Sequence, residues 1–250
     1  MKPLVKALAV GLIAAGIGVI VGRMLAPKPK PIPTEPLGRL QYGNELFAKG
    51  VLQTPKADEM TRYQLETDGQ RPFAVVVSCS DSRVPPELVF NQGLGDLFVV
   101  RVAGNIVNEE NLASIEYAVG HLKVPLIVVL GHTHCSVIKA AIEGQPLEGH
   151  LPHLVAHIEP VIRRLRHTHP HLKGDALIER VTQENVRHTI RAILERSEIV
   201  RKLYEAGKVQ FAGGVYHLRE GKVEWLKLPE GIEGDTHAEK PAKEASHSGH

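Results

Sequence analysis

Cysteine is scarce in this chain, with two residues among 250, and no Cys-x-x-Cys pair exists. Thiol redox chemistry of the kind that needs such a pair is therefore excluded. Aromatic residues make up only 4% of the chain, which argues against a surface that stacks nucleic acid bases. The formal net charge is only +2, so we expect no nucleic-acid partner.

The N-terminus carries an uncharged apolar run, residues 7–22, after a basic start. This pattern is typical of an export signal or a single membrane anchor. As a helix the run covers about 24 Å, which is short for a bilayer but workable if Lys6 and Arg23 extend to the interfaces. We interpret residues 1–26 as a signal peptide or membrane anchor and favour an uncleaved anchor. A buried N-terminal helix is the weaker alternative, because the run has no polar face.

The two flanks of the predicted folded part have the composition of solvated chain. Residues 27–36 contain five prolines, which predicts an extended linker. Residues 229–250 are mostly polar, and we expect a disordered tail. Export implies an extracytoplasmic location, in a bacterium the periplasm, with the protein either released or tethered to the membrane. In that oxidising compartment two lone cysteines are candidates for a disulfide, whereas the motifs around them favour zinc.

Apolar runs and helical patterns alternate along residues 37–228, which we expect to fold as a single domain. Apolar segments predict strands at residues 73–77, 97–101, 126–130 and 209–216, and an edge strand at 222–228. Helical spacing covers residues 37–50, 57–67, 111–122, 135–143, 151–167 and 176–206. This alternation predicts the α/β class, with a central, mostly parallel sheet of four parallel strands plus the edge strand, covered by helices.

Each cysteine lies in a short motif that follows a predicted buried strand. Cys79 comes directly after the first strand, and His132 and Cys135 follow the third. In parallel sheets the C-terminal edge of the strands is where ligands and chemistry collect. Two thiolates and one imidazole from neighbouring strand ends make a three-ligand zinc site with a fourth position open to exchange. The pattern therefore indicates a zinc enzyme.

The second motif is expected to begin a helix. His132 and Cys135 are three residues apart, so the first helical turn would bring both side chains to one side. His134 lies between them and is expected to be structural or to face solvent. The helical segment predicted at residues 135–143 is stopped by Gly144.

Asp81 and Arg83 follow Cys79 at alternate positions. A plain ion pair is the ordinary interpretation of such a spacing, and a small buried hydrophobic residue is the ordinary interpretation of a lone cysteine. The thiolate two residues before Asp81 favours a catalytic pairing instead. A carboxylate at this position can reach the metal as an exchangeable fourth ligand, or pair with the guanidinium through both oxygens.

Residues 73–105 and 115–137, which contain the Cys79-x-Asp81-x-Arg83 and His132-x-x-Cys135 motifs, resemble the β-class carbonic anhydrases. The interval from Cys79 to His132 is 53 positions. The resemblance extends over nearly the whole predicted folded part, residues 37–228. It implies a zinc-dependent enzyme that reversibly hydrates carbon dioxide to bicarbonate and a proton. It also implies a homodimer or a higher even oligomer.

The resemblance also assigns roles to individual positions. Cys79, His132 and Cys135 correspond to the ligands of one Zn²⁺ per chain, and Arg83 to the arginine that holds Asp81 off the metal in the active state. The positions that correspond to a substrate pocket in the plant-like subgroup are Gln70, Phe98 and Tyr117. The family usually has glycine after the second cysteine, where a backbone N–H faces the substrate, and this chain has Ser136. The backbone donor survives, but the added hydroxymethyl group crowds the pocket.

Two further functions compete with carbon dioxide hydration. A hydrolase of carbonyl sulfide or carbon disulfide would share the fold and the zinc site, with access to the pocket deciding the substrate. A non-catalytic zinc-binding scaffold would retain the fold without turnover. The pairing of Asp81 with Arg83 counts against the scaffold, because a structural site has no use for a displaceable ligand.

Overall fold

The structure, a computed structural model, describes residues 31–52, 57–144 and 146–229. The chain divides into two compact units, Met1–Ile32 and Pro33–His250, and nearly all described residues belong to the second. The predicted signal peptide or anchor and the predicted tail beyond residue 229 lie outside the described residues. Among the described residues, no helix is long and apolar enough to cross a membrane.

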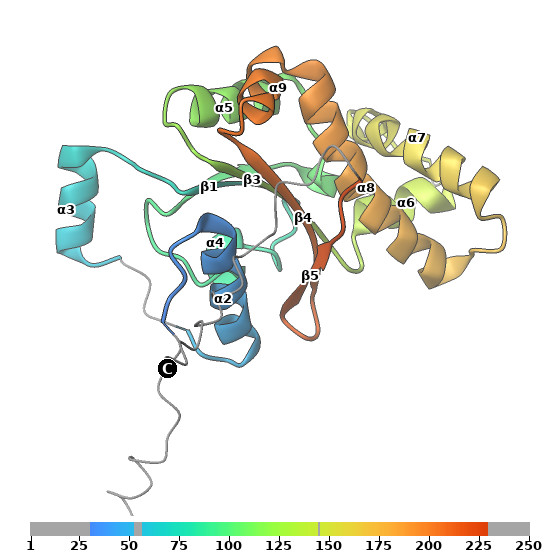
Figure 1. Cartoon of the computed structure of the whole chain (residues 1–250). Helices are drawn as coiled ribbons and strands as arrows, with labels where there is room; N and C mark the ends of the chain where they lie inside the picture. Colours follow the sequence, from blue (N-terminus) through green and yellow to red (C-terminus); the bar gives the residue numbers. More distant parts are fainter. Residues whose placement is uncertain (1–30, 53–56, 145, 230–250) are drawn as a thin grey trace, which may run out of the picture. The chain divides into compact units, whose positions relative to one another are not determined.

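A five-stranded sheet in the order β2-β1-β3-β4-β5 forms the centre of the described residues. Strands β1, β2, β3 and β4 are parallel, and β5 pairs with β4 in the antiparallel direction. The bounds are Ala74–Ser78 for β1, Leu97–Arg101 for β2, Leu126–His132 for β3, Gln210–His217 for β4 and Lys222–Leu226 for β5. The predicted α/β class, with four parallel strands and an edge strand, is confirmed (Figure 1).

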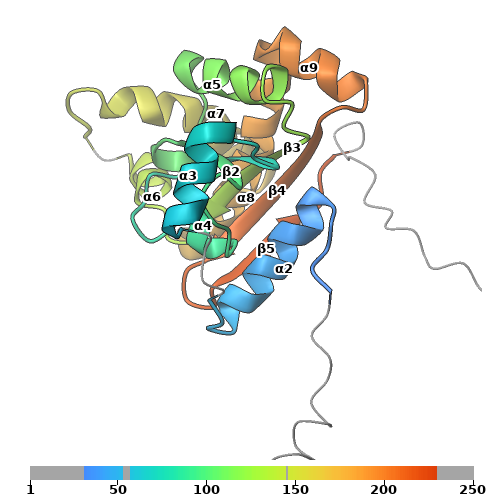
Figure 2. The same ribbon diagram turned by 90° about the vertical axis from the view of Figure 1, so that its left-hand side faces the viewer.

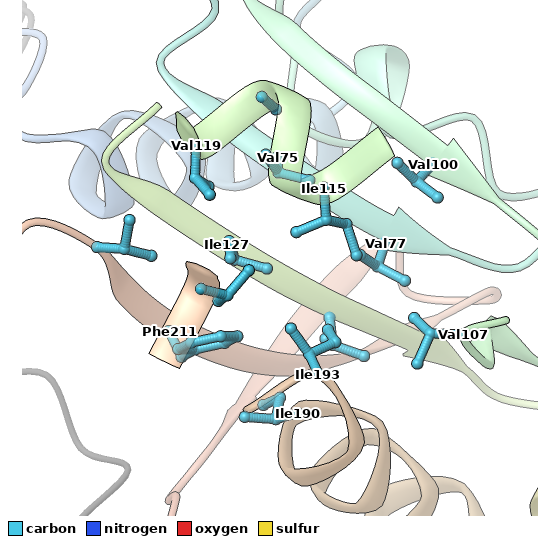
Figure 3. Close-up of a cluster of buried hydrophobic side chains, with 14 of the residues drawn as sticks. Val75, Val77, Val100, Val107, Ile115, Val119, Ile127, Ile190, Ile193 and Phe211 are labelled. Carbon is cyan, nitrogen blue, oxygen red and sulfur yellow. The ribbon is translucent and has the colours of Figure 1, made fainter. Parts of the chain in front are cut away.

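Strands β1 and β3 are buried along their whole length. Alternate side chains of one strand point to opposite faces of a sheet, so a run of valines supplies apolar contacts to both. Val75 and Val77 belong to one core cluster, and Ala74 and Val76 belong to another. Figure 3 shows the first cluster, in which Val75, Val77 and Ile127 meet side chains of the covering helices. Because both of their faces are buried, the central strands are covered by other elements on each side of the sheet.

Helices cover the two faces of the sheet (Figures 1 and 2). On one face α5, α8 and α9 contribute to the first cluster, and on the other α2 and α4 contribute to the second. Helix α2 lies along β5. The helices are α2 Pro36–Ala48, α3 Glu59–Asp68, α4 Pro86–Val89, α5 Glu109–Gly120, α6 Ser136–Glu143, α7 Leu151–Thr168, α8 Gly174–Arg196 and α9 Glu198–Glu205, with a 3₁₀ helix, η1, at Ala103–Asn105.

The single long helix predicted at residues 176–206 is wrong, because the chain breaks there into α8 and α9. Ser197 is extended (φ −109°, ψ 107°) and its hydroxyl oxygen accepts from the backbone N–H of Val200, which caps α9. The same hydroxyl donates to Glu116 on α5 at 2.6 Å. Helical spacing continues through the break, so periodicity alone does not reveal a serine that serves as an N-cap.

Two other details differ from the sequence prediction. His132 is the last residue of β3 and Cys135 precedes the first turn of α6, which begins at Ser136. The two ligands are therefore brought together by a strand end and a helix start, not by one helical turn. Helix α4 and the η1 turn were not predicted, since each is too short to produce a periodic pattern.

Helix α8 approaches the sheet closely over two glycines. A Cβ added to Gly131 of β3 or to Gly213 of β4 would lie 2.9 Å from a methyl carbon of Val186 on α8. Such a contact is too short for real Cβ atoms, so only glycine at these positions lets the helix lie as it does. The close approach brings the polar residues of α8 within reach of the loops at the C-terminal edge of the sheet.

Candidate metal centre

Cys79, His132 and Cys135 converge at the C-terminal edge of the sheet. Ser78, the last residue of β1, pairs with Leu130 of the adjacent strand β3, so Cys79 emerges beside the residues that lead to His132. All three side chains are buried, and their ligand atoms lie within 4.8 Å of one another. They form the only such group of three potential metal ligands within the described ranges. The structure thus brings the three predicted zinc ligands together.

The tautomer of His132 is set by its backbone surroundings. Nδ1 lies 2.9 Å from the carbonyl oxygen of Thr133. A carbonyl can only accept, so Nδ1 carries a proton, and Nε2 is the nitrogen left to bind a cation. Nε2 is buried and meets no hydrogen-bond partner among the described residues. An imidazole with one nitrogen anchored and the other unpartnered has the arrangement of a metal-binding histidine.

The side chains of Cys79 and Cys135 affect each other's pKa in opposite directions. The hydrogen bond with Cys135 lowers the pKa of Cys79 against the opposing effect of burial, and the Gly104 N–H lowers it further. The same bond to Cys79, together with burial, raises the pKa of Cys135. A divalent cation would bind both sulfurs as thiolates.

Asp81 is held by Arg83 through both carboxylate oxygens. Nε of Arg83 donates to Oδ1 at 2.9 Å and Nη2 donates to Oδ2 at 2.6 Å, while the backbone N–H of Arg83 also donates to Oδ1. The side chain of Asp81 is 15% exposed and that of Arg83 is 51% exposed. Hydrogen bonding to the Arg83 guanidinium holds the pKa of Asp81 well below its usual range. Oδ2 lies 3.9 Å from Nε2 of His132, so the carboxylate borders the cluster while paired with arginine.

Arg101 is a residue of this site that the sequence analysis missed. Its Nε donates to the carbonyl of Cys79 at 3.0 Å, and its Nη2 donates to the carbonyl of Asp81 at 2.7 Å. The pairing of β1 with β2 ends at Ser78 and Arg101. Beyond this end, the side chain of Arg101 bonds two further carbonyls of the chain that follows β1. Its position at the end of β2, parallel to β1, was the one signal available in the sequence.

Gly104 is a second residue that was missed. Its backbone N–H lies 3.3 Å from the sulfur of Cys79. Its φ of +78° belongs to the left-handed region, which glycine adopts at little cost. A Cβ there would lie 3.0 Å from Ile158. The sequence Ala-Gly-Asn after a strand indicates a turn with positive φ. The contact with the Cys79 sulfur depends on tertiary packing, so the sequence does not predict it.

The predicted pocket residues lie apart from the cluster within one chain. Phe98 pairs with Val75, four residues before Cys79, which corresponds to about 13 Å along the sheet. The ring of Phe98 contacts that of Tyr117, with centroids 6.3 Å apart. Gln70 is exposed in the segment before β1, towards the opposite end of that strand. Their role in binding substrate stays a prediction.

Two residues of the second motif face outward. Ser136 is exposed at the first position of α6, directly after Cys135. His134 is exposed as well, which confirms the expectation for it, and its backbone has a φ of 54°. The carbonyl of His134 accepts from Nη2 of Arg83 at 3.4 Å. The two motifs are thus linked through Arg83.

The donor set fits zinc better than other common cations. Two sulfurs and one imidazole nitrogen suit a tetrahedral ion of intermediate softness, whereas calcium and magnesium require oxygen ligands. The unpartnered Nε2 of His132, buried beside the two sulfurs, is consistent with a group that binds a cation. A fourth position remains for solvent or substrate while Arg83 holds Asp81.

Comparison with known proteins gives a consistent result. Residues 74–223 match the family model described as carbonic anhydrase. A carbonic anhydrase of Mycolicibacterium smegmatis is 40% identical over 189 residues, which cover 74% of this chain and 89% of the relative. A structure of tetrameric β-carbonic anhydrases from Sordaria macrospora aligns with a TM-score of 0.62 at 27% identity, covering 67% of this chain and 87% of the other. A Coccomyxa β-carbonic anhydrase in complex with acetazolamide also gives a TM-score of 0.62 at 27% identity, covering 74% and 81%.

Proposed function

The chain belongs to the β-class carbonic anhydrase family, and on that premise we propose that Cys79, His132 and Cys135 hold the zinc ion with which it reversibly hydrates carbon dioxide. The observation that carries the assignment is the convergence of three buried ligand atoms beside an arginine-held carboxylate. Zinc bound at this position supplies a Lewis acid that makes water a nucleophile near neutral pH. The family and the donor set support this chemistry together.

The role of Asp81 follows from its two possible partners. Paired with Arg83 through both oxygens, the carboxylate is kept from filling the fourth ligand position. Because its pKa is held well below the usual range by Arg83, it remains ionised at neutral pH and acts only as a hydrogen-bond acceptor. An acceptor beside the cluster can orient the hydrogen of the attacking nucleophile. Arg83 is the residue that keeps the site open.

The competing functions have less support. A scaffold has no need for a carboxylate that is withheld from the cluster by two short hydrogen bonds. A hydrolase of carbonyl sulfide or carbon disulfide would have the same ligand set, but the relatives that share the fold are carbonic anhydrases.

Metal analysis combined with stopped-flow carbon dioxide hydration tests the assignment. We expect about one zinc per chain in the purified protein, and loss of both zinc and hydration in His132→Ala. His134→Ala is the matched control, because His134 lies in the same motif but is exposed, and it should retain the metal. Zinc-free wild-type protein, or Cys79 and Cys135 joined as a disulfide, would refute the proposal.

We also propose that the active form is a homodimer or a higher even oligomer. Leu88, Leu94 and Tyr117 are 44–48% exposed, and β2 is an edge strand within the described residues. Apolar exposure near a free strand edge favours pairing with a second copy. The tetrameric relative supports an even assembly. Light scattering of wild-type and Tyr117→Asp protein tests this, since a monomeric wild type would contradict it.

The N-terminal segment underlies a proposal about location. The basic start and the apolar run at residues 7–22 support export, with the enzyme tethered outside the cytoplasmic membrane. Membrane fractions washed at alkaline pH should retain the full-length protein and lose a variant that begins at residue 27. Recovery of the full-length protein in the cytosolic fraction would refute the proposal.

A further inference from the structure

The Gly104 N–H is the backbone donor that meets the Cys79 sulfur. An N–H that points at a thiolate forms a charge-assisted hydrogen bond, which draws electron density from the sulfur. How strongly the sulfur donates to a bound cation therefore depends on where this N–H lies. The N–H belongs to η1, a turn of three residues.

The η1 turn has a backbone that needs outside support. Gly104 and Asn105 are consecutive residues with positive φ, 78° and 45°. The second is asparagine, which tolerates left-handed backbone better than most non-glycine residues but adopts it less readily than glycine. Within the turn, the N–H of Asn105 bonds the carbonyl of Val102. Contacts from outside the turn also support it.

These contacts come from α8, some eighty residues further along the chain. Nδ2 of Asn185 donates to the carbonyl of Gly104 at 2.8 Å, and Oγ1 of Thr189 donates to the carbonyl of Asn105 at 3.1 Å. Both side chains are buried. Asn185 thus bonds the residue that donates to the sulfur, whereas Thr189 bonds the residue after it.

We propose that Asn185 is a positioning residue for the metal centre, which holds the Gly104 N–H on the sulfur of Cys79 by binding the Gly104 carbonyl. It acts through Gly104 and touches neither metal nor substrate. The proposal rests on the proposed function for the identity of the metal site. It adds a buried amide on α8 that sets how strongly one ligand donates to zinc.

Loss of the Gly104 N–H contact should change the properties of the metal centre in a defined direction. Without the N–H contact the Cys79 thiolate donates more strongly, so a cation bound there is a weaker Lewis acid. The pH midpoint of kcat should then rise. Loss of a residue that orients a ligand also lowers metal affinity, typically by 10- to 100-fold. In cobalt-substituted protein the sulfur-to-metal charge-transfer band should move to longer wavelength.

Asn185→Leu tests the proposal, because it replaces the amide by an apolar side chain of similar size. Thr189→Val is the matched control, since it removes a buried hydroxyl donor to the same turn but not the bond to Gly104. The measurements are zinc affinity by chelator competition, the cobalt absorption spectrum and the pH profile of kcat. Unfolding in urea shows how much stability each variant loses.

We expect Asn185→Leu to weaken zinc binding by about tenfold or more, to shift the cobalt band and to raise the pH midpoint. Thr189→Val should lose similar stability and change none of the three. Should Asn185→Leu fail to fold, Asn185→Ser carries the same expectations with a smaller side chain. Equal effects of the Asn185 and Thr189 variants, or an unchanged cobalt band, overturn the proposal. A wild type without zinc or hydration activity would instead overturn the proposed function.

Discussion

The two cysteines of the metal centre are supported in different ways. Cys135 stands at the start of α6, where Cys79 and burial raise its pKa and the backbone N–H groups of Ile138 and Val137 partly oppose that rise. Its support comes from its own helix. Cys79 instead receives the N–H of Gly104 on its sulfur, and Arg101 on its carbonyl. Its support comes from β2, η1 and, through η1, from α8.

In this metal site one cysteine is supported by residues next to it in sequence, and the other by residues far away in sequence. A helix start supplies free N–H groups wherever it forms, so the surroundings of Cys135 follow from the local sequence. A loop after a strand has no set of free backbone N–H groups of this kind. Its geometry must be held by residues that are distant in the chain. Variants far from Cys79 in sequence should therefore affect the centre, whereas variants next to Cys135 should be tolerated.

Replacement of the ligands themselves should produce the largest effect, and it should be equal at the two positions. Cys79→Ser and Cys135→Ser each remove one of the three buried ligands. We expect each variant to lose zinc affinity by more than about a hundredfold and to lose hydration activity. Chelator competition and stopped-flow assays measure both. A variant that kept full zinc occupancy would show that its sulfur is not a ligand.

Loss of the arginine that holds Asp81 should produce the next largest effect on hydration. Arg83→Ala removes both side-chain bonds to the carboxylate, so Asp81 becomes free to occupy the fourth position. We expect hydration to fall by roughly 10- to 100-fold with zinc retained. Because Arg83 holds the pKa of Asp81 well below its usual range, the substitution should raise that pKa and weaken the effect at low pH.

The control for this variant is Arg163→Ala, which removes an exposed arginine paired with Glu159 on α7 and should leave hydration unchanged. The pH profile of hydration shows whether the prediction for Arg83→Ala fails. An Arg83→Ala protein with full hydration activity across pH 6 to 9 would show that Asp81 does not block the site.

The sequence predicted the sheet and the ligands well, for physical reasons. Runs such as Val75–Val77 and Ile127–Val129 are long, apolar and β-branched, so their burial between two helical layers is close to obligatory. Zinc ligands are reactive side chains of few types, and their position after strands is visible in one dimension. The class, the parallel strands and the group of Cys79, His132 and Cys135 could therefore be predicted.

What the sequence did not predict depends on packing across long intervals. Arg101 contacts Cys79 across 22 positions, and Asn185 contacts Gly104 across 81. Nothing in the local pattern of α8 distinguishes Asn185 from a polar residue that faces solvent. The break at Ser197 was missed for another reason, since helical spacing continues through it and its N-cap bond to Val200 does not alter that spacing. Hydrogen bonds between distant elements leave no periodic signal.

The non-local support of Cys79 can be tested with Arg101→Lys. Lysine keeps the charge but loses the fork that bonds two carbonyls at once. Because the loop that carries Cys79 and Asp81 then has one anchor fewer, we expect kcat/KM to fall by about tenfold. Zinc content and hydration are the measurements.

Arg201→Lys is the matched control. Arg201 also donates to two carbonyls, those of Leu194 and Glu195 at the end of α8, but it lies away from the metal centre. Its variant should lose comparable stability in urea without a loss of hydration. Equal hydration in the two variants would mean that the bonds of Arg101 serve the fold and not the site.

The local support of Cys135 should be the most tolerant part of the centre, and Ser136→Gly tests this at the adjacent residue. Ser136 is exposed at the first position of α6, and the change retains every backbone N–H that acts on the sulfur. We expect unchanged zinc affinity, a destabilisation below about 1 kcal/mol from the helix propensity of glycine, and hydration equal to that of wild type. A loss of zinc comparable to that of Asn185→Leu would show that the surroundings of Cys135 are no more local than those of Cys79.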